Sequence, residues 1–294
     1  MLNTTTLSSE TATRNETVRF AFGKNWKRYV SLLDEDRVRA AEGSIRELLG
    51  VSDLEGQSFL DVGSGSGLFS LAARRLGARV HSFDYDADSV SCTDEVRRHY
   101  RRNDPEWTVE RGSILDPTYV ASLGAFDVVY AWGVLHHTGA MWDALANTAT
   151  LVASSGTLAI AIYNDQGNWS HRWRAVKQFY CSGVLGRTVV CGSFIPAFIL
   201  RNLVSDIIGV RDPLARYAEY RHQRGMSVVH DWIDWLGGYP FEVARPEDIF
   251  DYFRDRGFDL RRLKTCRGTV GCNEYVFQRR GSAGVPVGRR LAAS

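Results

Sequence analysis

Residues 60–67 read Leu60-Asp61-Val62-Gly63-Ser64-Gly65-Ser66-Gly67, and this stretch, together with Asp84, says more about function than any other part of the chain. The apolar residues at its start suit a buried strand, and the apolar run 68–73 suits a helix packed on that strand. The three glycines let the backbone of the turn approach a nucleoside where a Cβ would collide. Asp84 ends the next apolar run, where a carboxylate of an α/β unit accepts ribose hydroxyls. The pattern predicts an adenosine-type cofactor.

The glycine spacing distinguishes between two cofactor classes. A dinucleotide fingerprint has glycines in the pattern G-x-G-x-x-G and places a pyrophosphate at the helix N-terminus. Here the pattern is G-x-G-x-G, and position 68 is Leu. Asp61 would repel a pyrophosphate, whereas it would attract the sulfonium and ammonium groups of S-adenosylmethionine (SAM). The stretch resembles motif I of the class I SAM-dependent methyltransferases. This resemblance implies SAM as cofactor, S-adenosylhomocysteine (SAH) as product, and Asp84 as the ribose-binding acid.

Composition and charge narrow the class of protein. The 294 residues are 44% hydrophobic and 24% charged, which is typical of a soluble globular chain. The net charge of +2 falls short of the basic character of nucleic-acid-binding domains, so we expect no nucleic-acid partner. Five cysteines without metal-ligand spacing predict reduced thiols in a cytoplasmic protein and no metal site.

Neither the N-terminus nor the most apolar region of the chain predicts a membrane anchor. Residues 1–14 are rich in Ser and Thr without an apolar core, so we expect them to be partly disordered and not a signal peptide. The most apolar region is 184–210, and its longest uncharged stretch is Thr188–Leu200. That stretch is too short to span a bilayer, so no transmembrane segment is expected.

Alternating strand and helix patterns predict a doubly wound, mostly parallel α/β sheet of seven strands. An expected helix over 36–49 leads into the first strand, expected helices over 86–102 and 142–153 lie between strands, and the fifth strand is expected over 156–163. At the end of the chain, a helix opening at Pro246 precedes two strands joined by a short link, which allows only an antiparallel hairpin. A parallel sheet that finishes in an antiparallel strand again resembles the class I methyltransferase fold.

The sequence divides into five segments. An N-terminal segment, 1–34, precedes the SAM-binding core at 35–163, and in similar enzymes such a segment covers the cofactor. Residues 164–244 do not fit the sheet and are aromatic with a helical pattern, so we interpret them as a helical lid over the substrate. A dimerisation insert is the alternative. The core closes with a helix and hairpin over 245–280, and 281–294 form a flexible tail.

The residues expected at the cofactor come from the glycine turn, from the ends of strands two to four and from the N-terminal segment. By resemblance, two of them flank the adenine and two pass the methionine part of SAM, while ordinary turn and helix packing remain alternatives. The expected set is Asp61, Gly63, Ser64, Gly65, Gly67, Asp84, Tyr85, Ser113, Ile114, Trp132, Gly133 and Trp26.

Candidate catalytic residues follow strand four and lie late in the insertion. His136 and His137 carry imidazoles whose ordinary pKa is near neutrality, so either suits a general base. His137 resembles a histidine common in the family's small-molecule members. His230, Asp231 and Glu242 lie together in the run 225–242 and form a second candidate set. A histidine that orients the loop and a polar network within the lid are the competing interpretations.

Substrate contacts are expected at the active edge of the sheet and in the insertion, from Tyr163, Asn164, Trp169, Trp235, Tyr239 and Asn273. We predict a SAM-dependent methyltransferase that acts on a small, partly apolar or aromatic molecule by in-line displacement, similar to the quinone-biosynthesis O-methyltransferase group. A homodimer through the insertion is a further possibility. The alternative functions are a catalytically inactive SAM-binding partner protein and a nucleotide-dependent oxidoreductase. The sequence leaves the acceptor atom open among O, N and C.

Overall fold

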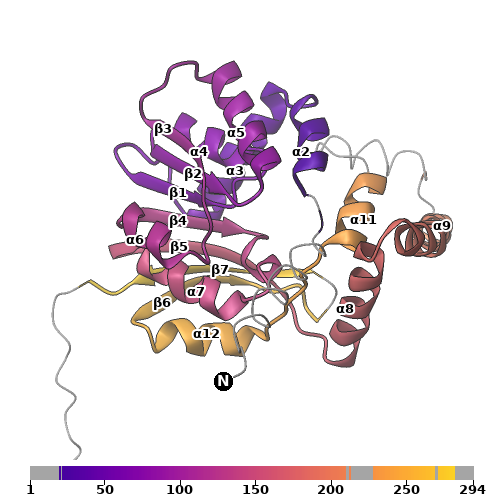
Figure 1. Cartoon of the computed structure of the whole chain (residues 1–294). Helices are drawn as coiled ribbons and strands as arrows, with labels where there is room; N and C mark the ends of the chain where they lie inside the picture. Colours follow the sequence, from indigo (N-terminus) through magenta and orange to yellow (C-terminus); the bar gives the residue numbers. More distant parts are fainter. Residues whose placement is uncertain (1–19, 21, 210–211, 213–227, 269–270, 282–294) are drawn as a thin grey trace, which may run out of the picture.

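The computed structural model describes residues 20, 22–209, 212, 228–268 and 271–281. The segment 1–14, expected to be disordered, and the tail from 282 onward lie outside the described residues. A seven-stranded sheet forms the centre of the molecule (Figure 1), in the order β3-β2-β1-β4-β5-β7-β6. Its strands are β1 (Ser58–Val62), β2 (Arg79–Asp84), β3 (Trp107–Arg111), β4 (Phe126–Trp132), β5 (Val152–Tyr163), β6 (Phe258–Lys264) and β7 (Cys272–Arg279).

The pairing of the strands confirms the predicted fold class. Strands β1 to β5 pair in parallel, whereas β7 pairs antiparallel with both β5 and β6. Because β7 runs backwards, Cys272 at its start pairs with Tyr163 at the end of β5. The start of β7 and the ends of the parallel strands therefore lie at one edge, where ligands bind in such sheets.

Helices cover both faces of the sheet because the central strands are apolar on both sides. Phe59 packs in the cluster with α3, α4 and α5, whereas its neighbour Leu60 packs in the cluster with α6, α7 and α12. This continuous burial is typical of parallel strands. The covering helices are α3 (Glu35–Leu49), α4 (Leu68–Arg75), α5 (Ala87–Tyr100), α6 (Pro117–Leu123), α7 (Met141–Thr150) and α12 (Pro246–Arg254).

One boundary differs from the expectation. The sequence predicts a helix over 142–153, but α7 ends at Thr150 and β5 begins at Val152. The backbone N–H of Phe126 donates to the Leu151 carbonyl at 2.8 Å, and Val152 pairs with Phe126 in the sheet. Pairing with β4 therefore determines where the helix ends. Between residues 141 and 155 the sequence has no glycine or proline that would mark the end of the helix.

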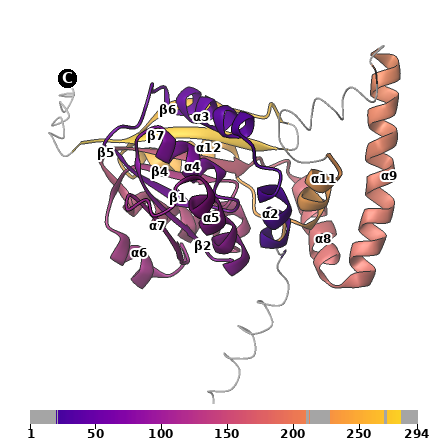
Figure 2. The same ribbon diagram turned by 90° about the horizontal axis from the view of Figure 1, so that it is seen from above.

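The insertion at 164–244 contains three described helices: α8 (Asn168–Cys181), α9 (Val184–Ile208) and α11 (Val228–Gly237). They lie to one side of the sheet (Figure 1), and α9 is the outermost of them (Figure 2). Pro196 lies inside α9 without ending it. By length and composition α9 is long and apolar enough to cross a membrane, and the expectation that the chain has no transmembrane segment stays a prediction.

Candidate cofactor site

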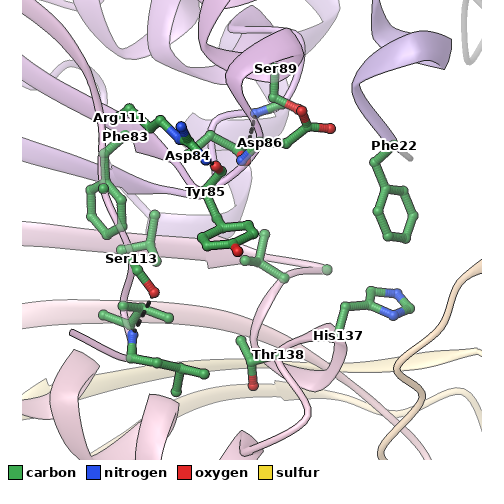
Figure 3. Close-up of a pocket in the computed structure, with 18 of the residues that line it drawn as sticks. Phe22, Phe83, Asp84, Tyr85, Asp86, Ser89, Arg111, Ser113, His137 and Thr138 are labelled. Atoms are coloured by element: carbon green, nitrogen blue, oxygen red, sulfur yellow. Dashed lines mark hydrogen bonds between the residues drawn. The ribbon is translucent and has the colours of Figure 1, made fainter. Parts of the chain in front are cut away.

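A cavity of about 730 Å³ opens at the edge of the sheet where the parallel strands end. This volume is in the usual range for small-molecule and cofactor sites. Its wall comes from the turn after β1, from the ends of β2, β3 and β4, and from α2 (Phe22–Val30). Figure 3 shows Asp84, Tyr85 and Asp86 on one side of the cavity and Phe22 beside His137 on another.

Close packing explains the glycines of the turn. The backbone N–H groups of Gly63 and Ser64 both donate to the Phe83 carbonyl, at 2.9 and 3.1 Å. Gly63 has φ 74°, and a Cβ there would lie 2.5 Å from Cγ1 of Val134 in the loop after β4. Gly65 has φ 55° and also lines the cavity. The turn is therefore fixed against the end of β2 with its backbone on the cavity wall.

Asp84 is held in position beside this turn. Its Oδ2 accepts the Gly65 N–H at 3.0 Å, and its Oδ1 accepts the Asp86 N–H at 2.9 Å. Burial raises the pKa of Asp84 to about 6, despite these hydrogen bonds, which favour the ionised form. Asp84 thus places a preoriented carboxylate on the cavity wall, where it would accept ribose hydroxyls.

The helix before the core closes one side of the cavity. Phe22 and Trp26 line it from α2. The Gly23 N–H donates to Oδ2 of Asp86 at 2.9 Å, which attaches α2 to the start of α5. A Cβ on Gly23 would lie 2.4 Å from Cβ of Asp88, so only glycine permits this approach. Trp26 thus lies on the cavity wall, and the covering role expected of its segment stays a prediction.

The lining fits SAM better than a dinucleotide. Among the described residues, Arg111 is the one Lys or Arg side chain on the wall, and it is already engaged with the Tyr85 carbonyl at 3.0 Å. Asp84 and Asp86 add two carboxylates. A pyrophosphate would meet net negative charge here, whereas a ligand with sulfonium and ammonium groups would be attracted. The residues present therefore fit SAM.

Four further expected cofactor residues line the cavity: Ser113, Ile114, Trp132 and Gly133. The Ile114 carbonyl accepts the Asn147 side-chain N–H at 2.7 Å, which fixes this segment against α7. Trp132 stacks on the Tyr130 ring with centroids 5.5 Å apart. Both aromatic and apolar groups therefore lie where an adenine or a methionine chain would pack.

Three expected cofactor residues, Asp61, Ser64 and Gly67, do not line the cavity. Asp61 is 3% exposed and accepts a hydrogen bond from Ser70 Oγ at 2.5 Å. Burial raises the pKa of Asp61 to about 7. Ser64 bonds Thr93 at 2.9 Å, and a Cβ on Gly67 would meet Thr93 Cα at 2.8 Å. These residues hold the turn against α4 and α5.

His137 is the expected catalytic histidine that lines the cavity. Its Nδ1 lies 2.7 Å from the Pro240 carbonyl oxygen, and its ring lies 5.0 Å from Phe22. Burial, with a smaller contribution from the nearby charge of Lys177, lowers the pKa of His137 to about 3. The ring is therefore neutral near pH 7. Because a carbonyl only accepts, Nδ1 carries the proton and Nε2 is the free acceptor.

His136 lies elsewhere, against the expectation that it reaches the site. It is 1% exposed, does not line the cavity, and its ring lies 4.1 Å from that of Tyr163. Burial holds the pKa of His136 well below its ordinary value, so it is neutral. Its Nδ1 has no hydrogen-bond partner among the described residues. His136 therefore packs beneath the loop that carries His137.

Glu242 caps a helix and does not line the cavity. Its Oε2 accepts the N–H groups of Gly139 and Met141 at 3.0 and 3.1 Å, at the start of α7. The carboxylate thus satisfies N–H groups that have no partner inside the helix. Sequence alone does not reveal this role, because Glu242 lies about a hundred positions from the helix that it caps.

We expect Glu242→Ala to lower the free energy of unfolding by about 1–2 kcal/mol, because the two N–H groups lose their acceptor. The affinity for SAH should remain within about twofold of the original value. Urea denaturation and isothermal titration calorimetry measure the two quantities. Glu242→Gln is the matched control, because its amide oxygen can still accept one of these bonds. Unchanged stability in Glu242→Ala would contradict the capping role.

The expected substrate residues fall in different places. Tyr239 lines the cavity. Asn164 and Asn273 bond each other through their side chains at 3.0 Å and join β5 to β7. Trp169 is 59% exposed and does not line the cavity. The side chains of His230 and Asp231 lie outside the described part of the structure, so their catalytic roles stay predictions.

Lys177 is a buried residue that sequence reasoning missed. It is 0% exposed on α8 and donates from Nζ to the Trp235 carbonyl. Its Nζ lies 4.7 Å from the Trp235 ring centroid, 5.0 Å from Phe241 and 6.0 Å from Tyr163. Burial lowers the pKa of Lys177 to about 7. Lys177 lies four positions after Trp173, which places the two side chains on the same side of a helix. This spacing from an aromatic residue is the signal in the sequence that could have indicated Lys177.

The described cysteine, histidine and carboxylate side chains do not form a disulfide or a metal site. None of the five cysteines forms a disulfide bond in the structure. Across the described ranges, no group of three or more His, Cys, Asp or Glu side chains is arranged to hold a metal ion.

Comparisons with known proteins agree with this geometry. The profile of a family described as "Methyltransferase domain" matches residues 33–205. The ribosomal protein L11 methyltransferase of Methylococcus capsulatus is 39% identical over 71 residues, which are 24% of this chain and 24% of that protein. The match thus spans about a quarter of the length of this curated relative.

Solved structures share the fold at low identity. Magnesium protoporphyrin IX methyltransferase from Synechocystis PCC 6803 with bound SAH is 15% identical with a TM-score of 0.52, over 92% of this chain and 99% of that one. An O-methyltransferase family protein from Burkholderia thailandensis is 12% identical with a TM-score of 0.50, over 83% of this chain and 57% of that one.

Proposed function

The chain belongs to the methyltransferase domain family, and we propose that this SAM-dependent methyltransferase acts on a small, partly apolar or aromatic acceptor. The observation that carries the proposal is the composition of one cavity. It combines a glycine turn and the Asp84 carboxylate with aromatic side chains from Phe20, Phe22 and Tyr239. A nucleoside fits the first part, and an apolar acceptor fits the aromatic part.

Different residues of the cavity would bind different parts of SAM. Asp84 would accept the ribose hydroxyls, Ser113 and Ile114 would flank the adenine, and Gly133 would admit the methionine chain. Bound SAM supplies a methyl group on a positively charged sulfur, which leaves as a neutral thioether. The chain must therefore chiefly orient the acceptor and exclude water. Orientation alone lowers the activation free energy of such a reaction by on the order of 7–11 kcal/mol.

His137 would receive the acceptor's proton. A neutral imidazole with its proton on Nδ1 offers Nε2 as the base, and the Pro240 carbonyl holds the ring in that tautomer. Its low pKa makes it a weak base, which suits an acceptor that becomes acidic as its bond to the methyl carbon forms. His137 is favoured over His136 as the reacting group because it lines the cavity and His136 does not.

The N-terminal helix and the insertion would shield the reaction. Phe22 and Trp26 cover the cavity from α2, and Tyr239 and Pro240 reach it from the end of the insertion. We infer that these segments act together as the lid. In agreement with a small acceptor, the structural neighbours named above include a methyltransferase for magnesium protoporphyrin IX. A protein acceptor, as the name of the ribosomal relative states for that enzyme, is the second candidate.

Transfer of a labelled methyl group tests the proposal. Purified protein is incubated with methyl-labelled SAM and with either the small-molecule or the protein fraction of a cell extract. We expect label to appear in low-mass, solvent-extractable products. Gly65→Val is the background control, because its Cβ would lie 3.1 Å from the Trp26 indole at a strained φ. Label in protein alone would favour the second candidate, and binding of SAM without any product would favour a non-catalytic role.

A further inference from the structure

The outward side of α9 is an apolar surface that the described residues leave uncovered. Nine large apolar side chains of this helix are more than 40% exposed, from Leu203 at 41% to Val184 at 82%. Leu185, Leu200 and Ile207 are 73%, 61% and 65% exposed. Figure 2 shows α9 as the outermost helix, with α8 and α11 between it and the sheet. Soluble domains seldom expose so many large apolar side chains on one helix without a partner.

The inner side of α9 is already occupied. Phe194 lies 5.3 Å from Trp173 of α8, and Phe198 lies 6.1 Å from Trp235 of α11, between ring centroids. Val190 is 4% exposed in the same cluster. These aromatic contacts anchor the helix to the protein. A partner for α9 must therefore bind its outer side. The helix can stay packed on α8 and α11 when that partner binds.

The chemistry of the outer side favours lipid over protein. No charged residue occurs between Arg187 and Arg201, on any side of the helix. Protein interfaces have a polar rim around their apolar centre, whereas the outer side of α9 has no charged residue along this stretch. The helix has 25 residues and a mean hydropathy of 1.5 over its most apolar window. It is roughly 37 Å long at the usual rise per residue.

The charged residues of α9 fit the same partner. Arg187 and Arg201 are exposed at the two ends of the uncharged stretch, and the Arg187 guanidinium lies 5.5 Å from the ring centroid of Tyr180 on α8. Long cationic side chains reach lipid headgroups while their stems stay against apolar groups. Because its inner side packs on α8 and α11, the helix would lie along a bilayer surface and not across it.

We propose that α9 binds the surface of a lipid bilayer with its outer side in the acyl region, so that the enzyme works at a membrane. The inference rests on the exposure and composition of α9 and is independent of the proposed acceptor. The bilayer would cover the apolar side chains, and the two arginines would contact the headgroups. The cavity with Asp84 and His137 stays in the part of the molecule that faces water.

Vesicle co-sedimentation tests the proposal with the full chain. We expect the wild type to sediment with phosphatidylcholine vesicles, and more strongly when they contain phosphatidylglycerol. A variant with Leu185→Glu, Leu200→Glu and Leu203→Glu should lose about tenfold or more of its partition into both kinds of vesicle, because three apolar groups leave the acyl region. Leu263→Glu, at a residue 42% exposed on β6, is the matched control and should bind as the wild type does.

Two outcomes would overturn the proposal. The first is a wild type that stays in the supernatant with both kinds of vesicle. The second is a wild type that light scattering shows to be a dimer, which the triple variant dissociates while vesicles bind neither protein. In that case a second copy covers α9. Circular dichroism and the thermal shift caused by SAH verify that each variant is folded, so a loss of binding is assigned to the surface.

Discussion

Asp84→Ala is expected to weaken SAH binding by roughly 1–3 kcal/mol, or about 5- to 150-fold. The carboxylate would accept hydrogen bonds from the ribose hydroxyls, and its removal leaves those groups without acceptors. It also holds the Gly65 and Asp86 N–H groups at 3.0 and 2.9 Å, so its loss releases the turn that forms the cavity wall. Both effects act on the same ligand and in the same direction.

Isothermal titration calorimetry with SAH measures this loss. Asp127→Ala is the matched control, because Asp127 also accepts a backbone N–H, from Ser58 at 2.9 Å, but does not line the cavity. We expect the control to bind SAH as the wild type does. An affinity of Asp84→Ala equal to that of the control would show that another residue binds the ribose.

The affinity for SAH is also expected to depend on pH, through the ionisation of Asp84. Burial raises its pKa to about 6, and the ionised form is the better acceptor for two hydroxyls. Binding should therefore be constant above about pH 6 and weaken as the pH falls through that value, by up to tenfold per pH unit. Asp84→Asn carries no titrating group, so its weaker affinity should not change over this range.

The sequence predicted the parts of the site that depend on local backbone geometry. Gly63 and Gly65 adopt positive φ in a turn that favours glycine. Asp84 ends a strand whose apolar pattern can be recognised from the sequence. These residues meet at one edge because parallel strands align their ends. Family resemblance extended the prediction to Ser113 and Trp132, which also line the cavity.

The same reasoning failed where distant segments meet. Glu242 looked like an acid near the substrate, yet its carboxylate caps α7 about a hundred positions earlier. His136 and His137 are adjacent in sequence, but one is buried against Tyr163 and the other lines the cavity. No pattern along the chain distinguishes these cases. The described parts of the insertion are mostly helical, but the exposure of α9 depends on how the three described helices pack.

Lys177 is expected to give the protein a stability that rises with pH between about 7 and 10. Burial lowers its pKa from 10.5 to about 7 in the folded protein, whereas the unfolded chain keeps the ordinary value. Between these pH values the unfolded state binds a proton that the folded state lacks. Stability therefore rises with pH, by up to about 1.4 kcal/mol per pH unit from this group. Below pH 7 the full cost of the buried charge remains.

Lys177→Met removes that titration while keeping a flexible side chain of similar length among Tyr163, Trp235 and Phe241. Urea unfolding at pH 7 and at pH 9 gives the change in stability for each protein. The wild type should gain about 2–3 kcal/mol more than the variant over this interval, since all other groups titrate in both. Lys264→Met, at a lysine whose side chain is 67% exposed, should keep the wild-type dependence. Equal changes in wild type and Lys177→Met would mean that Lys177 stays charged in the folded protein, because an anionic partner offsets its burial.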